Sequence, residues 1–211
     1  MKRITLTLML ALSVLTGGLY ARSQNAQNMD RMMMVDKATV EGIIANWKPK
    51  PQEVARTIIA KYGMPNEATA MRLIWHNNGP WKRTELVNEE IPHSFPKPHP
   101  DMLKQTISYR VPTDKFDELA EYDGSVIVER TKGEIAARCD KEEANFLALN
   151  LANEIATGKR SAESARKFYA EAIRDMKHPE YMRGFLFQVA RAEGGDADRE
   201  VMTGDEKRRN N

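Results

Sequence analysis

Short strand-like segments joined by tight turns are the feature that most limits the folds open to this chain. Residues 68–76 and 81–87 carry alternating apolar side chains, and residues 77–80 between them are an Asn-Asn-Gly-Pro turn. Residues 125–129 and 134–138 form a second pair of this kind. Because a connection of a few residues can join only antiparallel strands, a parallel, doubly wound sheet is excluded.

Segments whose apolar residues recur at helical spacing lie before and after these hairpins. Residues 51–62 have it, and so do two later segments, which begin after Asp140 and after Ser161. Asp140 and Glu143 have the spacing of a reciprocal capping pair. The sequence therefore predicts an α+β fold, with an antiparallel sheet built from hairpins and with helices packed mainly on one face.

Four prolines lie within ten residues, at positions 92, 96, 98 and 100. Proline has no backbone N–H and a fixed φ, so residues 91–100 are expected to join neither a helix interior nor a central strand. We expect a stiff loop instead. Such a loop loses little conformational entropy when it binds a ligand.

The first residues are typical of an export signal. Lys2 and Arg3 precede an uncharged, mostly apolar run over residues 4–15, and Ala21 offers a small residue for cleavage. A membrane anchor needs roughly 20 apolar residues, which is longer than this run. We therefore predict a cleavable signal peptide over residues 1–21 and a periplasmic or secreted mature protein.

Composition divides the rest of the chain into three parts. Residues 22–38 are polar and end near a methionine cluster, which indicates a flexible leader. Residues 39–193 are expected to form a single α+β domain, since their length suits one core. Residues 194–211 carry almost no apolar side chains and are expected to form a disordered tail.

The charge balance argues against two classes of partner. Lys2 and Arg3 are the only charges in residues 1–21, so the remaining chain keeps 30 of the 32 basic residues and all 30 acidic residues, a net charge of zero. A neutral surface exerts no long-range attraction on nucleic acid. No later segment is apolar enough to cross a bilayer, so we expect no nucleic-acid partner and no integral membrane segment after cleavage.

Local resemblances support export. The run AKYGMP at residues 60–65 leads from a helix into a Trp-bearing strand, and it resembles the helix–Gly-x-Pro–strand unit of β-lactamase-inhibitor-like modules. The runs IWHNNGPWKR at residues 74–83 and YDGS at residues 122–125 resemble those of an uncharacterised exported bacterial protein family. The resemblance implies a bacterial source and an exported location, and it implies no activity.

Common catalytic signatures are missing from the sequence. It contains no Gly-x-Ser-x-Gly, His-Glu-x-x-His, nucleotide-binding loop or Cys-x-x-Cys motif. Cys139 is the only cysteine, so it cannot form a disulfide within the chain. With no histidine near it in the sequence, Cys139 is expected to be a small buried side chain or, alternatively, half of an intermolecular disulfide.

The tip of the first hairpin combines indole rings with hydrogen-bond donors, which suits a ligand-binding surface. The candidate ligand-binding residues are Trp75, Asn77, Asn78, Trp81, Lys82 and Arg83. Of the two indoles, that of Trp81 is expected to be exposed. This pattern favours an exported, non-enzymatic binding or interaction protein of the bacterial cell envelope, with an unknown envelope ligand or protein as its partner and no cofactor.

Three of the four histidines lie within 24 residues of each other, which suggests an alternative. If the proline-rich loop folds over the hairpin tip, His76, His93, His99 and Asp101 would converge and could hold a divalent metal. The alternative function is then a small metal-dependent enzyme that uses His76, His93 and His99. A hydrolase with paired carboxylates among residues 85–90 is a third possibility.

Overall fold

The computed structural model describes residues 34–175, 177–189, 195, 196, 198 and 200. The predicted signal peptide, most of the predicted leader and most of the predicted tail lie outside the described residues. Within the described chain, helix α2 begins at Lys37, inside the segment expected to be a leader. Asp36 caps this helix by accepting a hydrogen bond from the backbone N–H of Thr39 at 3.0 Å.

The described chain alternates short helices with antiparallel strands. Its first half contains α2 (Lys37–Ile44), α3 (Pro49–Tyr62), β1 (Glu67–Thr69), β2 (Arg72–His76), β3 (Arg83–His93) and β4 (His99–Ser108). Its second half contains the 3-10 turn η1 (Thr113–Lys115), α4 (Phe116–Tyr122), β5 (Val126–Glu129), β6 (Glu134–Cys139), α5 (Glu142–Ala156), α6 (Ala162–Asp175) and α7 (Glu180–Arg183). The strands form one sheet in the order β1-β2-β3-β4-β6-β5, and every neighbouring pair is antiparallel. The predicted α+β class is confirmed.

One face of this sheet is apolar and carries the helices. Leu73, Leu86 and Leu103 are cross-strand partners on β2, β3 and β4, and Cys139 continues the row on β6. All four side chains are buried. Side chains two residues apart on a strand share a face, so this row marks the side that packs inward.

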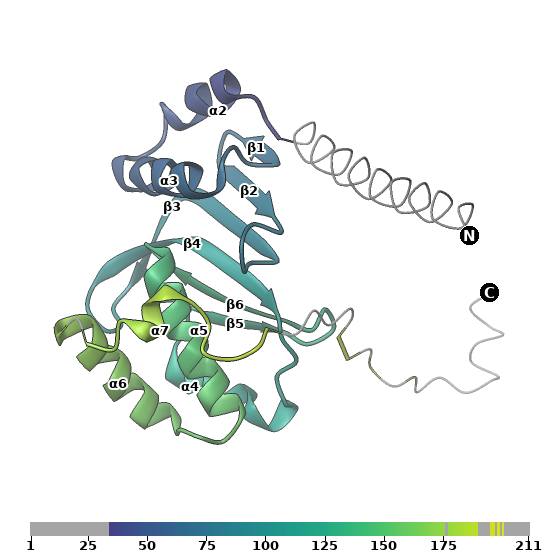
Figure 1. Ribbon diagram of the computed structural model, residues 1–211, viewed down its shortest axis with the longest axis vertical. Helices are drawn as coiled ribbons and strands as arrows, with labels where there is room; N and C mark the ends of the chain where they lie inside the picture. Colours follow the sequence, from purple (N-terminus) through teal and green to yellow (C-terminus); the bar gives the residue numbers. More distant parts are fainter. Residues whose placement is uncertain (1–33, 176, 190–194, 197, 199, 201–211) are drawn as a thin grey trace, which may run out of the picture.

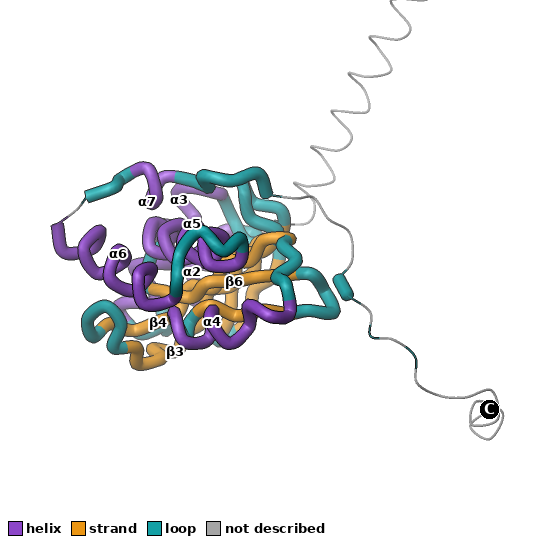
Figure 2. Tube along the Cα trace, turned by 90° about the horizontal axis from the view of Figure 1, so that it is seen from below, coloured by secondary structure: helices purple, strands orange, loops and turns teal. Residues whose placement is uncertain are grey.

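The helices cover this face as two groups at opposite ends of the molecule (Figure 1). α2 and α3 pack over the β1–β3 end, where Val54 and Ile58 join the cluster that contains Leu73 and Leu86. α4, α5 and α6 form a layer over the other end, in front of the strands in Figure 2. There, side chains such as Leu147 of α5 pack with residues of β4, β5 and β6. The prediction that helices pack mainly on one face is confirmed.

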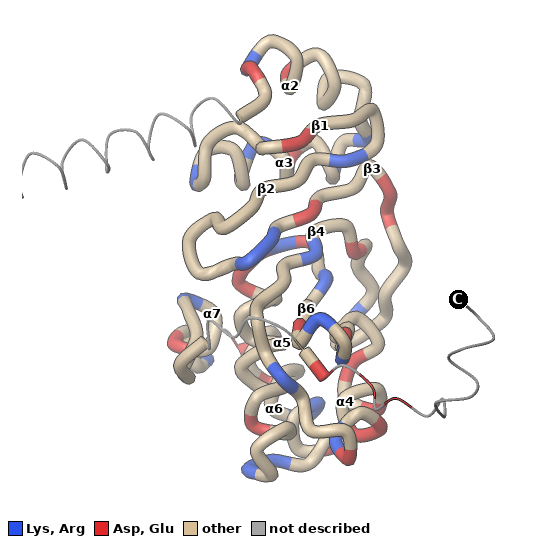
Figure 3. Tube along the Cα trace, turned by 90° about the vertical axis from the view of Figure 1, so that its right-hand side faces the viewer, with Lys and Arg blue, Asp and Glu red and all other residues tan. Residues whose placement is uncertain are grey.

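The opposite face of the sheet is held by ion pairs. Arg83 bonds to Glu85 at 3.1 Å and to Glu134 at 3.0 Å, and Lys104 pairs with Glu85 at 2.6 Å. Figure 3 shows basic and acidic residues interspersed rather than gathered into a zone of one sign. Alternation between this face and the leucine face is the pattern of a sheet that is packed on one side only.

The expectation that residues 91–100 form a single loop is wrong at both ends. β3 continues to His93 and β4 begins at His99, so Pro92 and Pro100 are cross-strand partners. The reason is local: β2 and β6 pair with other parts of β3 and β4, so these ends form a two-stranded ribbon. With no third strand beside it, the ribbon tolerates residues that lack an N–H.

The predicted capping of α5 is also wrong. The helix begins at Glu142 with Lys141 as its N-cap, and no side chain caps it. Asp140 lies one residue before the cap position. The side chain of Glu142 at the first helical position is bonded inside the protein, to partners that the local sequence does not contain.

Glu142 is the main polar link between the parts of the fold. Its carboxylate is buried, with 5% of the residue exposed. Its Oε1 atom accepts hydrogen bonds from the Tyr62 hydroxyl at 2.6 Å, the Trp81 indole N–H at 2.6 Å and the Gln105 amide at 2.9 Å. The ammonium group of Lys61 pairs with Oε2. These donors come from α3, the first hairpin and β4, so one carboxylate joins three elements to α5.

The same donors keep this carboxylate ionised. Burial alone raises the pKa of Glu142, but the hydrogen bonds from Lys61, Tyr62, Gln105 and Trp81 outweigh burial and hold the pKa below its ordinary value of 4.5. Ionised acceptors form stronger hydrogen bonds than neutral ones. The network therefore stabilises the fold while Glu142 carries its charge.

The chain end also contacts the sheet. The Asp196 N–H donates to the Arg130 carbonyl at 3.0 Å, and the Asp196 carboxylate pairs with the Arg130 guanidinium at 2.8 Å. Gly195 accepts a hydrogen bond from Arg110 at 2.9 Å. These two residues, which fall in the segment expected to be a disordered tail, are therefore bound to Arg110 after β4 and to the β5–β6 turn.

We expect Glu142→Ala to lower the free energy of unfolding by about 3–5 kcal/mol, because it leaves buried donors without an acceptor. Urea unfolding followed by circular dichroism measures this loss. The matched control is Glu143→Ala, since Glu143 is exposed beside it and should change stability by less than about 0.5 kcal/mol. Equal losses in the two variants would contradict the assigned role.

The pH dependence of stability should contain a contribution from Glu142. Its pKa is lower in the folded than in the unfolded protein, so its stabilisation is complete above pH 4.5 and is lost as the pH falls through the depressed folded value. We expect the stability difference between wild type and Glu142→Gln to shrink as unfolding is measured from pH 7 down to pH values below 4.5. A difference that stays constant across this range would argue against an ionised Glu142.

Candidate functional site

The end of the β3–β4 ribbon brings two histidines and an aspartate together. His93 and His99 are cross-strand partners, and Asp101 lies two residues beyond His99 on the same strand. Because side chains at this spacing share a face, all three project from one side of the ribbon. One ligand atom from each residue lies within 4.8 Å of the others. Among the described residues, this is the group whose ligand atoms could hold a metal ion.

Each oxygen of Asp101 faces one imidazole. His99 Nε2 lies 3.2 Å from Asp101 Oδ1, and His93 Nδ1 lies 3.3 Å from Asp101 Oδ2. Neither contact has hydrogen-bond geometry, since His93 Nδ1 and Asp101 Oδ1 are both buried without a hydrogen-bond partner. Buried polar atoms are rarely left unpaired, so these two atoms remain available to a ligand.

The distal nitrogen of each imidazole faces an oxygen acceptor. His99 Nδ1 lies 2.8 Å from the Lys97 carbonyl, and His93 Nε2 lies 3.5 Å from Asp123 Oδ1. Asp123 is fixed in turn by the backbone N–H and the hydroxyl of Ser125, both at 2.8 Å. Metal-binding histidines commonly have such an acceptor behind them, which orients the ring and selects the nitrogen that faces the metal.

Buried negative charge surrounds these rings. Asp101 is 1% exposed, and Asp123 is buried as well. Burial raises the pKa of Asp101, while the nearby His93, His99 and Arg138 act in the opposite direction. The Arg138 guanidinium lies 3.8 Å from Asp101. The two buried carboxyl groups outnumber the one arginine beside them, which favours a bound cation.

The connecting turn is held rigidly against the helical layer. Phe95 lies between His93 and His99 in the sequence. Its ring packs against that of Tyr169 of α6, with a centroid distance of 5.1 Å. The Arg166 guanidinium covers the same ring at 4.1 Å. These contacts fix the residues on both sides of the turn, so the imidazoles are positioned before any ligand arrives.

Cys139 also reaches this cluster, which sequence reasoning missed. Its Sγ lies 3.4 Å from His99 Nε2 and 3.6 Å from Asp140 Oδ1. Burial strongly raises the pKa of the thiol. A small cavity of about 50 Å³, lined in part by His99 and Cys139, opens beside them. The relevant signal was not the local sequence but the pairing of β4 with β6, which places the end of β6 beside the ribbon.

The two indoles of the hairpin-tip surface predicted from the sequence are buried, whereas Asn77 is exposed and Lys82 and Arg83 are partly exposed. Trp75 is 2% exposed and Trp81 is 1% exposed, so the expectation that Trp81 presents its ring to solvent is wrong. Trp75 donates to the Gly63 carbonyl at 2.9 Å, and Trp81 donates to Glu142. Both indoles are core residues with satisfied N–H groups, which removes the flat platform from the proposed ligand site.

The polar residues of the hairpin tip already have partners in the fold. Asn78 donates to the Thr84 hydroxyl at 3.0 Å, and Lys82 and Arg83 pair with Glu134 at 2.8 and 3.0 Å. Asn77 occupies the left-handed position of the turn, with φ of 50°. Asn78, Lys82 and Arg83 therefore make structural contacts, and the binding role of these polar residues stays a prediction.

The proline-rich segment and the hairpin tip do not meet. They lie at opposite ends of β3, whose eleven residues span about 30 Å. His76, near the tip, pairs with Glu67 at 2.6 Å and is not part of the metal-binding group. The structure therefore brings together His93, His99 and Asp101, and it places the fourth predicted ligand elsewhere.

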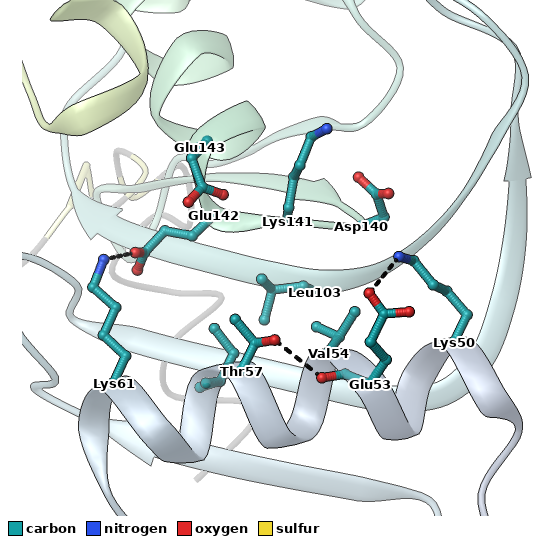
Figure 4. Close-up of a pocket in the computed structure, with 11 residues that line it drawn as sticks. Lys50, Glu53, Val54, Thr57, Lys61, Leu103, Asp140, Lys141, Glu142 and Glu143 are labelled. Carbon is teal, nitrogen blue, oxygen red and sulfur yellow. Dashed lines mark hydrogen bonds and ion pairs between the residues drawn. The ribbon is translucent and has the colours of Figure 1, made fainter. Parts of the chain in front are cut away.

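A larger cavity lies between α3 and the start of α5, with about 270 Å³ of space (Figure 4). Its lining includes Leu103 of β4 together with lysines and acidic residues from both helices. Lys50 pairs with Glu53 at 3.1 Å, and Lys61 pairs with Glu142. Because its charges are largely paired with each other, this cavity is a weaker candidate than the ribbon cluster.

The chain matches no protein-family model, no curated protein and no solved structure. The resemblance to exported bacterial proteins therefore stays a prediction. Every helix among the described residues is too short or too polar to cross a membrane.

Substitutions at the hairpin tip should report its structural role. We expect Trp81→Ala to lower the free energy of unfolding by about 3–5 kcal/mol through loss of core volume. Trp81→Phe, which mainly removes the hydrogen bond to Glu142, should cost about 1–2 kcal/mol. Lys82→Ala, which removes a partly exposed side chain next to Trp81, should lower the free energy of unfolding by less than about 1 kcal/mol. Thermal unfolding compares the three, and a near-neutral Trp81→Ala would restore the exposed-platform hypothesis.

Proposed function

We propose that this protein is an exported, non-enzymatic metal-binding protein of the bacterial cell envelope, which holds one divalent transition-metal ion of the zinc type through His93, His99 and Asp101. The observation that carries the proposal is the convergence of these three side chains around unpaired, buried ligand atoms. The exported location rests on the basic, apolar and small-residue pattern of residues 1–21.

The distances in the cluster support a metal ion better than a hydrogen bond. Zinc binds imidazole nitrogen at about 2.0–2.1 Å and carboxylate oxygen at about 2.0–2.2 Å, so two such ligands of a tetrahedral ion lie about 3.3 Å apart. The two nitrogen–oxygen distances to Asp101 are 3.2 and 3.3 Å, and each runs to a different oxygen, so one ion between the rings would be bound by both carboxylate oxygens. A typical N–H···O hydrogen bond is shorter, about 2.9 Å.

Binding is favoured over catalysis by the space available. The cavity beside His99 holds about 50 Å³, which suits a water molecule rather than an organic substrate. The metal-dependent enzyme remains the second candidate because this cavity opens on His99. Such an enzyme would use His93 and His99 without His76, which is paired with Glu67.

The proposal is tested by titrating the metal-free protein with zinc. We expect one ion per chain by calorimetry and a rise in melting temperature of about 5–10 °C at a hundredfold excess over the dissociation constant. His99→Ala and Asp101→Asn should each abolish or greatly weaken this response, since each removes a ligand.

His76→Ala is the matched control, because it removes a histidine of the same sheet that lies outside the cluster. It should bind zinc as the wild type does. An unchanged melting temperature in the wild type, or equal zinc affinity in His99→Ala, would overturn the proposal.

A further inference from the structure

We infer that the cavity between α3 and the start of α5 is a second ligand site, and that it takes a small zwitterion with an apolar side chain, such as an apolar amino acid. The inference goes beyond the proposed metal site, because none of the residues that line this cavity belongs to the metal-binding group. Three features of the cavity carry it: an apolar base, an ion pair at each end, and a middle part whose charges have both signs.

The base of the cavity is apolar and firmly packed. It is formed by Val54 and Ile58 of α3 and by Leu103 of β4, which are exposed by 5%, 2% and 0%. These side chains also pack in the hydrophobic cluster that contains Leu73 and Leu86. The space of about 270 Å³ lies just below the range of roughly 300–1,000 Å³ that is usual for small-molecule sites. The cavity therefore suits a molecule of the size of an amino acid, with its apolar side chain on this base.

An ion pair lies at each end of the cavity (Figure 4). Lys50 pairs with Glu53 at 3.1 Å at one end, and Lys61 pairs with Glu142 at the other. The two lysines are separated by about 16 Å along the axis of α3, with Leu103 between them. Because each lysine already faces a carboxylate, these four groups neutralise one another. The charge that a ligand must carry is then set by the middle of the cavity.

The middle of the cavity is lined by Asp140, Lys141 and Glu143, which lie across from α3 in Figure 4. Lys141 and Glu143 make no ion pair with any residue that the structure describes, and the Asp140 carboxylate lies 3.6 Å from the Cys139 thiol. A ligand therefore meets one cationic and two anionic groups. In addition, no side chain caps the start of α5 at this place, so the N–H groups of its first turn are not occupied by a capping side chain.

This combination of charges selects the class of ligand. A purely anionic ligand would face the carboxylates of Asp140 and Glu143, and a purely cationic one would face Lys141 and the positive end of the α5 dipole. A purely apolar ligand would remove these charges from water without pairing them. A zwitterion avoids all three costs, because its carboxylate can face Lys141 while its ammonium group faces the two carboxylates.

Calorimetric titration of the full chain with L-leucine tests the inference, in the presence of a chelator so that the outcome does not depend on the metal site. We expect one leucine per chain, with a dissociation constant below about 1 mM. N-acetylleucine lacks the ammonium group and leucinamide lacks the carboxylate, so each should bind at least about tenfold more weakly. Alanyl-leucine identifies the source of the zwitterion: tighter binding than leucine assigns the site to the ends of peptides, and weaker binding assigns it to free amino acids.

Two tryptophan substitutions on α3 form a matched pair. Thr57 is exposed and lines the cavity, so Thr57→Trp should fill the space and abolish leucine binding. Arg56 is exposed as well but does not line the cavity, so Arg56→Trp should bind leucine as the wild type does. Because both side chains lie outside the core, both variants should fold, which far-ultraviolet circular dichroism establishes.

Lys141→Met separates a binding role from a structural one. It should weaken leucine binding at least about tenfold and leave leucinamide binding unchanged, because leucinamide has no carboxylate for the lysine to face. Three results would each overturn the inference: no binding of leucine to the wild type at about 10 mM, equal leucine affinity in Thr57→Trp, or binding of N-acetylleucine as tight as that of leucine.

Discussion

The buried carboxylate of Glu142 is the constraint on which most of this structure depends. The helices cover the sheet as two separate groups, each with its own apolar cluster. Glu142 lies between them and accepts hydrogen bonds from Tyr62, Trp81 and Gln105. A hydrophobic cluster tolerates small shifts, whereas a charged acceptor with several donors does so only at a high cost in free energy. The relative positions of α3, β4 and α5 are therefore set by polar geometry.

This constraint also reaches the candidate metal site. Glu142 is the first residue of α5 and follows the end of β6 by three residues, so its contacts hold the passage between strand and helix. Cys139 and Asp140 lie in that short passage, next to His99. The site is thus formed by two segments with different supports, a ribbon held by Phe95 and a strand end held by Glu142.

The sequence predicted those parts of the fold that depend only on residues close to one another in the chain. Alternating side chains and the turn at Asn77 were sufficient for the β2–β3 and β5–β6 hairpins, although the segment expected to be one strand over residues 68–76 is divided between β1 and β2. The indoles were misjudged because the partner of Trp81 is Glu142, which is 61 residues away. The role of Pro92 depended on which strands lie beside it, and no local pattern contains that information.

The candidate site could be predicted only in part for the same reason. His93, His99 and Asp101 were grouped because they lie close together in the sequence, in a segment expected to be a loop, and the structure brings them together by cross-strand pairing instead. His76 was grouped with them on sequence proximity alone, although a strand of eleven residues separates the two ends. Cys139 and Asp123 escaped notice because they come from β6 and from the turn before β5. The contacts of Asp196 with the sheet affect the edge formed by β5. β5 is one of the two edge strands, and the Asp196 N–H donates to the carbonyl of Arg130, the residue directly after it. This carbonyl also accepts from the Gly133 N–H within the turn, so Asp196 joins the turn to a segment 66 residues later in the chain and limits fraying at this edge of the sheet.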